Sequence, residues 1–562
     1  MNSAGAQLPT ADWIQYPDRT GSAFTAAYAM DNASNGDVYT TGAYASTGAS
    51  LGTIDFDPSA NTASLDEYGF FISRHDSSGN LIWVIQVNDV SATDYILAKD
   101  IDTDDSGNVY VIGDFEGSED FDPGSGNAIL TSNGIKDIFI AKYNAQGQYC
   151  WAFLISSGAY DFGKTICYFD GHIFVAGNFG SGADFDPSAG VYTDQVFVGC
   201  TGMFLACYTV GSQFVWEETI QGTLLLPGGA LPISVAIDND SDIVVYGAYL
   251  DHCDFNPSAQ TDTLPLPNNS NGGNFLAQYN TDGSLVYVKQ IAGSNGGYTG
   301  YARINVTNLN TIVVAGMYNF TVDFDPYSTQ GSFTANYNPN FPSHTDIFAV
   351  TYSNNGTYQS GFSIGQVDQD CGYDVTSDAN GNIILVSFFQ TNVIDVDPGV
   401  GATVIGPLDA MGDGIVSKYS PSGQLLYAFP IQTYGLDIIF GATHYQDKLR
   451  LCGYVGNTFD FDPGAPVMTA TLNPGYNYFI VQYSDVLLSS IWQEENINEA
   501  GYSIYPNPAA DFITIKTDVQ IDVVNIYDAK GSLVQTNVGT NMIPVSNLSA
   551  GIYFVKITDI EA

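Results

Sequence analysis

The sequence predicts an all-β protein whose main body is a seven-bladed β-propeller with four antiparallel strands in each blade. Three observations support this class. An acidic motif of the form Asp-x-Asp-Pro recurs seven times, once with Asn as its third residue, and its copies begin 65, 64, 70, 69, 72 and 65 residues apart. A nearly constant period indicates one supersecondary unit repeated in an array. The chain also holds 59 Gly, 37 Tyr and 33 Phe, and short aromatic runs between Gly-containing turns are typical of strands.

The second repeat shows the four expected strands most clearly. They span residues 98–102, 109–113, 137–143 and 148–153, and turns at 104–108 and 144–147 join the first and last pairs. Gly within clusters of Asn, Asp and Ser supplies the positive φ that hairpin turns require. Four strands per repeat favour a propeller; a β-solenoid is the alternative, but its coils usually have shorter repeats.

Two aromatic positions recur in the same register as the acidic motif. The third strand of the second repeat reaches Tyr143, and the first repeat has His75 at that place. The corresponding tyrosines of the other repeats are Tyr208, Tyr279, Tyr352, Tyr419 and Tyr483. Fourth strands carry Trp83, Trp151, Trp216, Tyr287, Tyr358 and Tyr427. The repeats therefore share one strand plan.

The two ends of the repeat array predict how the ring closes. The seventh repeat ends after its third strand at Tyr483, and no fourth strand follows. A strand with the matching aromatic, Trp13, stands before the first repeat at residues 12–16. We expect this N-terminal strand to complete the seventh blade and leave no open sheet edge.

Each acidic motif follows the second strand of its repeat, so a meander places all seven copies on one face of the ring. Their polar residues are Asp55 and Asp57, Asp120 and Asp122, Asp184 and Asp186, Asp254 and Asn256, Asp323 and Asp325, Asp395 and Asp397, and Asp460 and Asp462. Strand alternation puts these side chains on one side and the central Phe (Val in one copy) on the other. We expect the apolar residue to pack between sheets.

Two hypotheses explain the paired carboxylates. Carboxylates two residues apart in a strand lie roughly 6–7 Å apart and repel each other by roughly 2–2.5 kcal/mol at an effective dielectric constant near 20. Calcium would offset this repulsion, because it prefers carboxylate and amide oxygens. Turn chemistry, in which each Asp accepts hydrogen bonds from nearby backbone N–H groups, offsets it equally well. The motifs therefore predict either calcium sites or capped turns.

The charge of the chain excludes several classes of partner. It carries 14 basic and 60 acidic residues, a formal net charge of −46. Such a chain is repelled by nucleic acid and by anionic membranes. No apolar run approaches the roughly 20 residues of a transmembrane helix. We expect no nucleic-acid partner and no transmembrane segment.

No catalytic signature is present. The five histidines show no metal-binding spacing, and GxSxG, P-loop and dinucleotide-binding patterns are absent. The arginines Arg19, Arg74, Arg303 and Arg450 occupy unmatched repeat positions, unlike the arginine cluster of a sialidase. Seven cysteines have no regular spacing, and Cys150 and Cys167, which flank one connection between repeats, are a candidate disulfide. We expect no catalytic residues and no cofactor other than calcium.

The repeat region, residues 11–484, carries the pieces GNVYVIG at 107–113, DFDPG at 120–124 and DIFIAKY at 137–143, followed by Trp151. This pattern resembles the bacterial β-propeller repeats often called SBBP repeats. The resemblance implies a propeller of an exported bacterial protein, and it implies no shared catalytic activity.

The C-terminal region carries YPNPAAD from residue 505, IYDAKG from 526 and LSAGIYFVKI from 548. In order and spacing these pieces closely resemble the type A C-terminal sorting domain of the type IX secretion system of Bacteroidota. The resemblance implies a small Ig-like β-sandwich that the outer-membrane export machinery recognises and usually removes. Such domains generally continue past VKI, so we expect either that the end is trimmed or that the last strand is incomplete. An Ig-like adhesive module is the alternative interpretation of this region.

These observations predict four segments. Residues 1–10 are the remnant of a signal region, since Ala4 and Ala6 resemble the A-x-A end of a signal peptide. Residues 11–484 form the propeller, 485–502 a linker and 503–562 the sorting domain. The expected protein is secreted or on the cell surface of a Gram-negative bacterium. It serves as a binding or structural module, adhesin-like or self-assembling, whose ligand is a glycan, a protein or itself. The alternative is an extracellular enzyme acting on polysaccharide or peptide at the acidic face.

Overall fold

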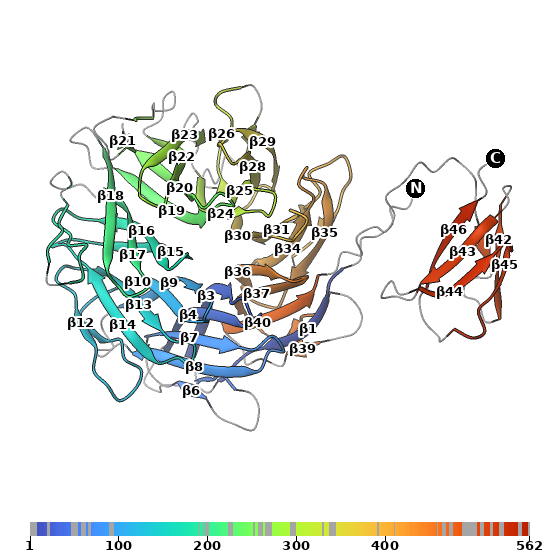
Figure 1. Ribbon diagram of the computed structural model, residues 1–562, viewed down its shortest axis with the longest axis horizontal. Helices are drawn as coiled ribbons and strands as arrows, with labels where there is room; N and C mark the ends of the chain where they lie inside the picture. Colours follow the sequence, from blue (N-terminus) through green and yellow to red (C-terminus); the bar gives the residue numbers. More distant parts are fainter. Residues whose placement is uncertain are drawn as a thin grey trace. The chain divides into compact units, whose positions relative to one another are not determined.

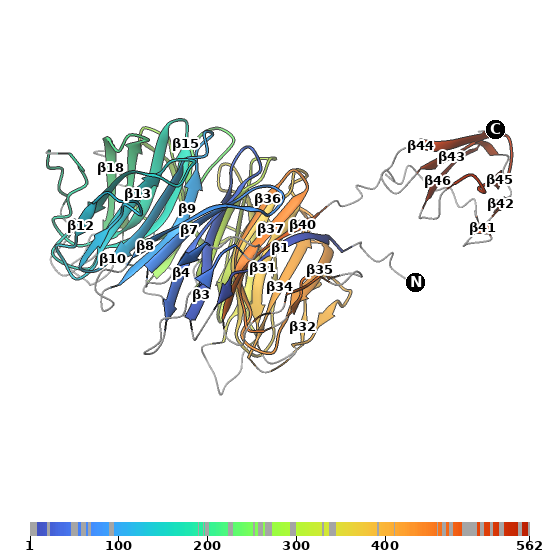
Figure 2. The ribbon, with the colours of Figure 1, turned by 90° about the horizontal axis from the view of Figure 1, so that it is seen from below.

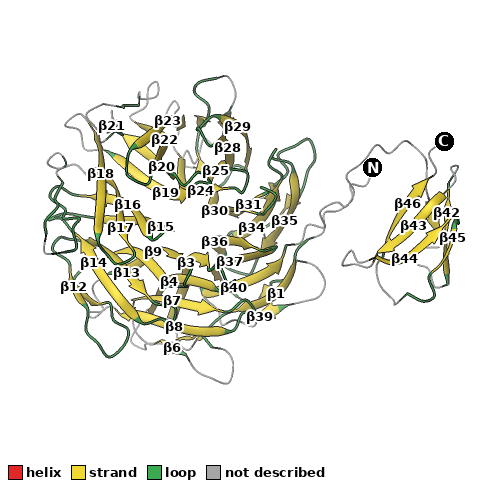
Figure 3. Ribbon diagram, viewed as in Figure 1, coloured by secondary structure: helices red, strands yellow, loops and turns green. Residues whose placement is uncertain are grey.

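The computed structural model describes residues 8–19, 23–46, 54–57, 63–65, 69–88, 95–188, 190–194, 196, 202–222, 229–250, 253–256, 262–264, 272–292, 299–328, 331–336, 344–390, 393–407, 409, 411–457, 459–463, 468–470, 472, 476–485, 503–505, 511–517, 521–527, 533–548 and 553–559. Every regular element in these ranges is a β-strand, as Figure 3 shows. The described part of the chain thus has no helix able to cross a membrane. The predicted all-β class is confirmed.

The chain divides into two compact units, residues 1–486 and 487–562. Within the described residues, the first unit contains seven antiparallel sheets of four long strands each, and the third sheet has a short fifth strand, β21 (Cys253–Asp254), at its edge. In the first six sheets the long strands lie side by side in chain order. Sheet 1 comprises β3 (Ala23–Asn32), β4 (Val38–Ser46), β7 (Gly69–His75) and β8 (Leu81–Asn88). Sheet 2 comprises β9 (Ile96–Thr103), β10 (Val109–Phe115), β13 (Asp137–Tyr143) and β14 (Tyr149–Ile155). Sheet 3 comprises β15 (Phe162–Phe169), β16 (His172–Phe179), β17 (Gly202–Thr209) and β18 (Phe214–Gly222).

The remaining four sheets follow the same plan. Sheet 4 comprises β19 (Ala230–Ile237), β20 (Ile243–Leu250), β22 (Gly272–Tyr279) and β23 (Leu285–Ala292). Sheet 5 comprises β24 (Thr299–Val306), β25 (Thr311–Tyr318), β28 (Asp346–Ser353) and β29 (Tyr358–Ile364). Sheet 6 comprises β30 (Asp370–Ser377), β31 (Ile383–Phe389), β34 (Asp413–Tyr419) and β35 (Leu425–Ile431). Sheet 7 comprises β36 (Ile438–Tyr445), β37 (Lys448–Val455), β40 (Asn477–Ser484) and β1 (Thr10–Gln15).

The first strands of the seven sheets surround the centre of a ring (Figure 1). β3 contacts β9, and the contacts continue in order through β15, β19, β24, β30 and β36, which returns to β3. Figure 2 shows the ring from its side. The N-terminal strand closes it as predicted, because β1 pairs antiparallel with β40, with Ile14 opposite Val481.

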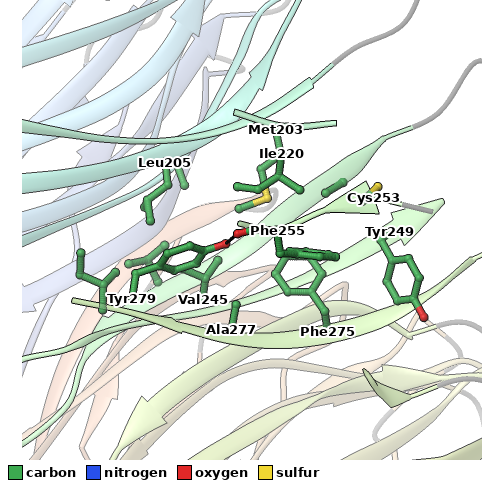
Figure 4. Close-up of a cluster of buried hydrophobic side chains, with 14 of the residues drawn as sticks. Met203, Leu205, Ile220, Val245, Tyr249, Cys253, Phe255, Phe275, Ala277 and Tyr279 are labelled. Atoms are coloured by element: carbon green, nitrogen blue, oxygen red, sulfur yellow. Dashed lines mark hydrogen bonds between the residues drawn. The ribbon is translucent and has the colours of Figure 1, made fainter. Parts of the chain in front are cut away.

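The apolar core lies between neighbouring sheets. The cluster shared by sheets 3 and 4 includes Met203, Leu205, Val245 and Phe275, all at most 1% exposed (Figure 4). The candidate disulfide is wrong: Cys150 and Cys167 are both free thiols. Cys150 lies on the outermost strand of sheet 2 and Cys167 on the innermost strand of sheet 3, so the two residues occupy opposite edges of neighbouring sheets.

The second unit consists of two three-stranded sheets. One contains β41 (Ser503–Tyr505), β42 (Phe512–Lys516) and β45 (Met542–Pro544). The other contains β44 (Leu533–Val538), β43 (Ile521–Tyr527) and β46 (Phe554–Asp559). Ile515 and Ile543 of the first sheet share one buried cluster with Val524 and Ile526 of the second. Most of the predicted linker and signal remnant lies outside the described residues.

Candidate functional site

The first aspartate of each acidic motif caps the turn that contains it. Oδ1 of Asp120 accepts hydrogen bonds from the backbone N–H groups of Asp122, at 3.1 Å, and Ala128, at 2.8 Å. The same pair of bonds, from residues two and eight positions later, is formed by Asp55, Asp184, Asp254, Asp395 and Asp460. Asp323 accepts the first bond of the pair, from Asp325. These are the hydrogen bonds that the turn hypothesis requires.

The second polar residue of most motifs acts on the turn that follows. Oδ1 of Asp122 accepts the N–H of Gly124 at 2.8 Å, and Asp186 and Asp397 make the equivalent bond with Ser188 and Gly399. Asp325 accepts the hydroxyl of Ser328, and Asn256 donates to Asp262. Asp57 is half-buried and Asp462 is buried at the same motif position.

The central residue of the motif explains the recurring tyrosine. The hydroxyl of Tyr143 donates to the carbonyl oxygen of Phe121 at 3.0 Å. The equivalent bonds join Tyr208 to Phe185, Tyr279 to Phe255, Tyr352 to Phe324, Tyr419 to Val396 and Tyr483 to Phe461. Figure 4 shows the Tyr279–Phe255 bond within the core between sheets 3 and 4.

The motifs lie at the rim and join neighbouring sheets. β5 (Ile54–Asp55) pairs with β2 (Asp18–Arg19), which follows the outermost strand of sheet 7. β21 (Cys253–Asp254) pairs with β18, the outermost strand of sheet 3. Small hairpin strands such as β6 (Ser64–Leu65) and β12 (Ile129–Thr131) occupy the outer edge in Figure 1.

The apolar residue of the motif packs as expected. Phe121 is buried with Phe70 of sheet 1 and Phe139 of sheet 2. The motif therefore stabilises the ring at its rim. Among the described residues, no three His, Cys, Asp or Glu side chains converge where a metal ion would fit, and calcium binding at the motifs stays a prediction.

A different site lies at the centre of the ring. Every first strand contains a β-bulge, and the unpaired residues are Tyr28, Lys99, Lys164, Ile233, Tyr301 with Ala302, Tyr373 and Phe440. All but Ala302 line one cavity of about 420 Å³. A bulge re-aims a side chain out of the regular alternation of its strand. The seven bulges together build the cavity, which we call the central pocket.

Glycines in the second strands accommodate the bulges. A Cβ added to Gly113 would lie 2.0 Å from the carbonyl oxygen of Leu97, on the strand that bulges at Lys99. The corresponding glycines are Gly42, Gly177, Gly247, Gly316 and Gly453. In sheet 6 the roles are exchanged, because Ser387 of the second strand faces Gly372. The bulge thus needs a residue without a side chain on one of the two strands.

One part of the central pocket is basic. Lys99, Lys164 and Arg303 are three of the chain's 14 basic residues, and each comes from a different sheet. Lys99 forms an ion pair with the buried Asp114. Burial lowers the pKa of Lys164, and repulsion from Lys99 and Arg303 lowers it further. Lys164 therefore lies close enough to Lys99 and Arg303 for their positive charges to repel its own.

The other part of the pocket is an arc of aromatic rings. Tyr301 contacts Tyr373 with ring centroids 5.8 Å apart, and Tyr373 contacts Phe440 at 5.2 Å. Phe440 in turn contacts Tyr28 at 5.3 Å. Tyr301 is 63% exposed, so much of this residue is accessible to solvent. The arc crosses sheets 5, 6, 7 and 1.

Two half-buried carboxylates follow bulge residues and link the inner strands. Asp374 accepts the N–H of Ala442 on the next sheet at 2.9 Å, and Asp100 accepts the N–H of Ile166 at 3.0 Å. Burial raises the pKa of Asp374 to about 6, against an opposing effect of Arg303. Burial also raises the pKa of Asp100.

The pocket lies away from the predicted motif sites. Lys99 and Lys164 lie near the start of β9 and β15. In an antiparallel meander the first strand starts at the end where the second strand finishes, so these two bulges lie in the half of their strands nearer the end that carries the motifs. No motif residue lines the pocket.

Sequence reasoning missed the pocket because it followed the positions that the repeats share. The type of residue at the bulge differs from repeat to repeat. Arg303, which lies next to the bulge of the fifth sheet, has no arginine at the corresponding position of another repeat. The available signal was a chemically variable residue 20–27 positions before each motif, on a strand whose partner carries a recurring glycine.

Comparison with known families identifies the C-terminal unit. Residues 503–562 match the secretion system C-terminal sorting domain. An uncharacterized WD repeat-containing protein, L264 of Acanthamoeba polyphaga mimivirus, is 23% identical over 443 residues, which cover 66% of this chain and 31% of that protein. The chain thus spans about a third of the length of that relative.

Similar solved structures have low sequence identity. A protein of unknown function from Dyadobacter fermentans is 9% identical with a TM-score of 0.37, covering 86% of this chain and 100% of its own. The polysaccharide lyase Uly1 is 9% identical with a TM-score of 0.41, covering 81% and 89%. The α-L-arabinanase of Penicillium chrysogenum is 11% identical with a TM-score of 0.31, covering 68% and 93%. These similarities carry no argument about activity. The C-terminal sorting domain of residues 503–562 marks the chain as a secreted or cell-surface protein of Bacteroidota exported by the type IX secretion system.

Proposed function

We propose that the protein is an extracellular binding module whose ligand is a saccharide held in the central pocket. The observation that carries this proposal is the convergence of one bulge residue from each of the seven first strands on one cavity. A bulge interrupts a ladder of backbone hydrogen bonds, and bulges are enriched where a side chain is directed into a site. Bulges at equivalent positions of all seven first strands indicate a binding site.

The size and lining of the pocket suit a sugar. A cavity of about 420 Å³ lies within the ~300–1,000 Å³ that small-molecule sites occupy. Aromatic rings such as those of Tyr301 and Phe440 present flat apolar faces, against which the C–H face of a pyranose can stack, while tyrosine hydroxyls supply polar contacts. Export to the cell surface places the pocket where such ligands occur.

A glycan array followed by titration calorimetry tests the proposal. The Tyr301→Ala variant should lose at least tenfold in affinity for any glycan that the wild-type protein retains, because it removes the most exposed ring of the arc. Tyr327→Ala is the matched control, since Tyr327 is 67% exposed and lies in a rim hairpin outside the pocket. Equal loss in both variants, or binding of a protein or a second copy of the chain with the pocket variants unaffected, would contradict it.

An enzyme acting on the same saccharide is the second candidate. The observation that favours it is a carboxylate beside the pocket: Asp374 directly follows the lining residue Tyr373, and burial raises the pKa of Asp374 to about 6. General acids and bases work best with pKa values near the ambient pH. The test is release of new reducing ends from a bound glycan. Turnover that is lost in Asp374→Asn, with melting temperature and glycan affinity retained, would support an enzyme; no turnover leaves the binding module.

A further inference from the structure

We infer that the central pocket selects a saccharide that carries a negative charge, such as a carboxylate or a sulfate group. This inference rests on the proposed function, because it specifies the ligand of the same pocket. It depends on where the few basic residues of the chain lie, on how they are paired, and on what lies beside them.

The placement of the cations is unlike the rest of the molecule. The chain has 60 acidic residues and only 14 basic ones, yet Lys99, Lys164 and Arg303 line a single cavity. They come from sheets 2, 3 and 5, which are brought together only at the axis of the ring. Lys99 and Lys164 are themselves bulge residues, and Arg303 is the first paired residue after the bulge in sheet 5.

The three cations are not fully neutralised by ion pairs. Lys99 pairs with Asp114, which also lies 3.3 Å from Lys136. In the described part of the chain, no carboxylate oxygen lies within 4 Å of the charged atoms of Lys164 or Arg303. One guanidinium nitrogen of Arg303 donates to the carbonyl oxygen of Ile233 at 3.3 Å. Donors of both side chains thus remain for a ligand.

The nearby carboxylates are engaged with the backbone. Asp100 and Asp374 accept N–H groups of the next sheet, although both are near enough to Arg303 for its charge to oppose the rise in their pKa. Mutual repulsion among the cations contributes to the lowered pKa of Lys164. An anionic ligand group between Lys164 and Arg303 relieves this repulsion, and a guanidinium binds carboxylate or sulfate oxygens in pairs.

The aromatic arc determines what else the ligand must carry. Tyr301 and Arg303 belong to the same strand, two residues apart, so the arc begins next to the cations. A ligand that reaches both therefore needs a charged group attached to a ring with an apolar face. An acidic pyranose meets both requirements, whereas a free inorganic anion meets only the first and a neutral sugar only the second.

Titration calorimetry with three galactose-based oligosaccharides of equal length tests the inference, using a uronate, a sulfated and a neutral probe. At low ionic strength we expect at least one acidic probe to bind about tenfold more tightly than the neutral one, because a hydrogen bond to a charged group is stronger than a neutral one. Raising the NaCl concentration should weaken only the acidic probes. The tighter of the two acids identifies the charged group.

Charge-removing variants supply the second readout. Lys164→Gln and Arg303→Gln should each weaken binding of the acidic probe about tenfold more than binding of the neutral probe. Lys289→Gln is the matched control, because Lys289 lies on the outermost strand of sheet 4 and bonds to the carbonyl oxygen of Asn355. Unchanged melting temperatures verify the fold.

The outcomes separate the two proposals. A neutral probe that binds as tightly as the acidic ones, with both variants ineffective, overturns the charge requirement and leaves a saccharide-binding pocket. Binding of sulfate or acetate alone, as strong as that of the acidic sugars, also overturns it, because the ring then contributes nothing. If no sugar on the array binds, the proposed function itself fails.

Discussion

The indole Nε1 of Trp13 donates a hydrogen bond of 3.1 Å to the carbonyl oxygen of Ser77, so the first described strand is fastened to the first sheet. Trp83 makes the same bond to Ala145, and Trp151 to Val210. Trp216 and Tyr287 continue the series with Thr281 and Asn354. In each case an aromatic side chain of an outermost strand donates a hydrogen bond to a backbone carbonyl in the last turn of the next sheet. Trp13 extends this series across the point where the ring closes.

Removing this contact should weaken ring closure. Trp13→Ala removes the hydrogen bond and the packing of the indole against Gly79, where an added Cβ would lie only 2.6 Å away. We expect a loss of about 2–3 kcal/mol in the free energy of unfolding, measured by urea denaturation. Trp13→Phe should cost about 1 kcal/mol. Ile82→Ala, at a site that is 46% exposed, is the control, and an equal effect there would refute the role of Trp13.

The glycines opposite the bulges can be tested directly. Gly113→Ala places a Cβ 2.0 Å from a backbone oxygen, so we expect a loss of more than about 3 kcal/mol or failure to fold. Gly158→Ala is the control, because no atom lies within 4 Å of the added carbon. Thermal unfolding distinguishes the two. A Gly113→Ala protein with the melting temperature of the wild type would show that the bulge tolerates a side chain.

A substitution in the acidic motif can distinguish turn capping from calcium binding. Asp120→Ala leaves the N–H groups of Asp122 and Ala128 without their acceptor, which should cost about 1–3 kcal/mol. We expect the same loss with chelator as with about 10 mM calcium. Sites with a dissociation constant near ~1 mM would instead gain about 1.4 kcal/mol each from ~10 mM calcium. A wild-type melting temperature that chelator does not change would contradict the calcium hypothesis.

His75 should make the protein sensitive to acid. It occupies the repeated tyrosine position and is 1% exposed, and burial lowers its pKa to about 4 from an ordinary value of 6.5. The unfolded state therefore binds a proton before the native state does, so stability is complete above pH ~6.5 and falls as the pH drops towards ~4. The loss should reach about 2 kcal/mol at pH ~5.

His75→Tyr should remove this dependence, because a tyrosine there does not titrate in that range. Its hydroxyl should also reach the carbonyl oxygen of Phe56, as Tyr143 reaches that of Phe121. Melting temperatures of both proteins at pH 7 and pH 5 provide the measurement. Equal acid sensitivity of the two proteins would assign the effect to other groups.

Deleting residues 503–562 should abolish export without unfolding the ring, because the sorting domain belongs to a separate compact unit. We expect the shortened chain to remain inside the cell, as measured by fractionation and by protection from added protease. Its melting temperature should match that of the ring in the full chain. Surface display of the shortened chain would show that another part of the protein directs export.

Much of the fold was accessible from the sequence because its signals are local and repeated. The period of the motif located the strands, Trp13 identified the closing strand, and both expectations agree with the pairing of β1 and β40. The turn hypothesis for Asp120 and its equivalents also rested on neighbouring residues alone, since the N–H groups concerned are two and eight positions away.

Only the tertiary structure decided the pocket. Lys99, Lys164 and Arg303 stand 65 and 139 residues apart along the chain, and closure of the ring alone brings them together. A bulge also changes the direction of a side chain without an unambiguous sequence signature, because backbone register depends on the partner strand. The sequence by itself therefore determined the repeat architecture of the ring and the export of the protein from the cell. Packing of the first strands around the axis of the ring decided which of the variable residues line the central pocket.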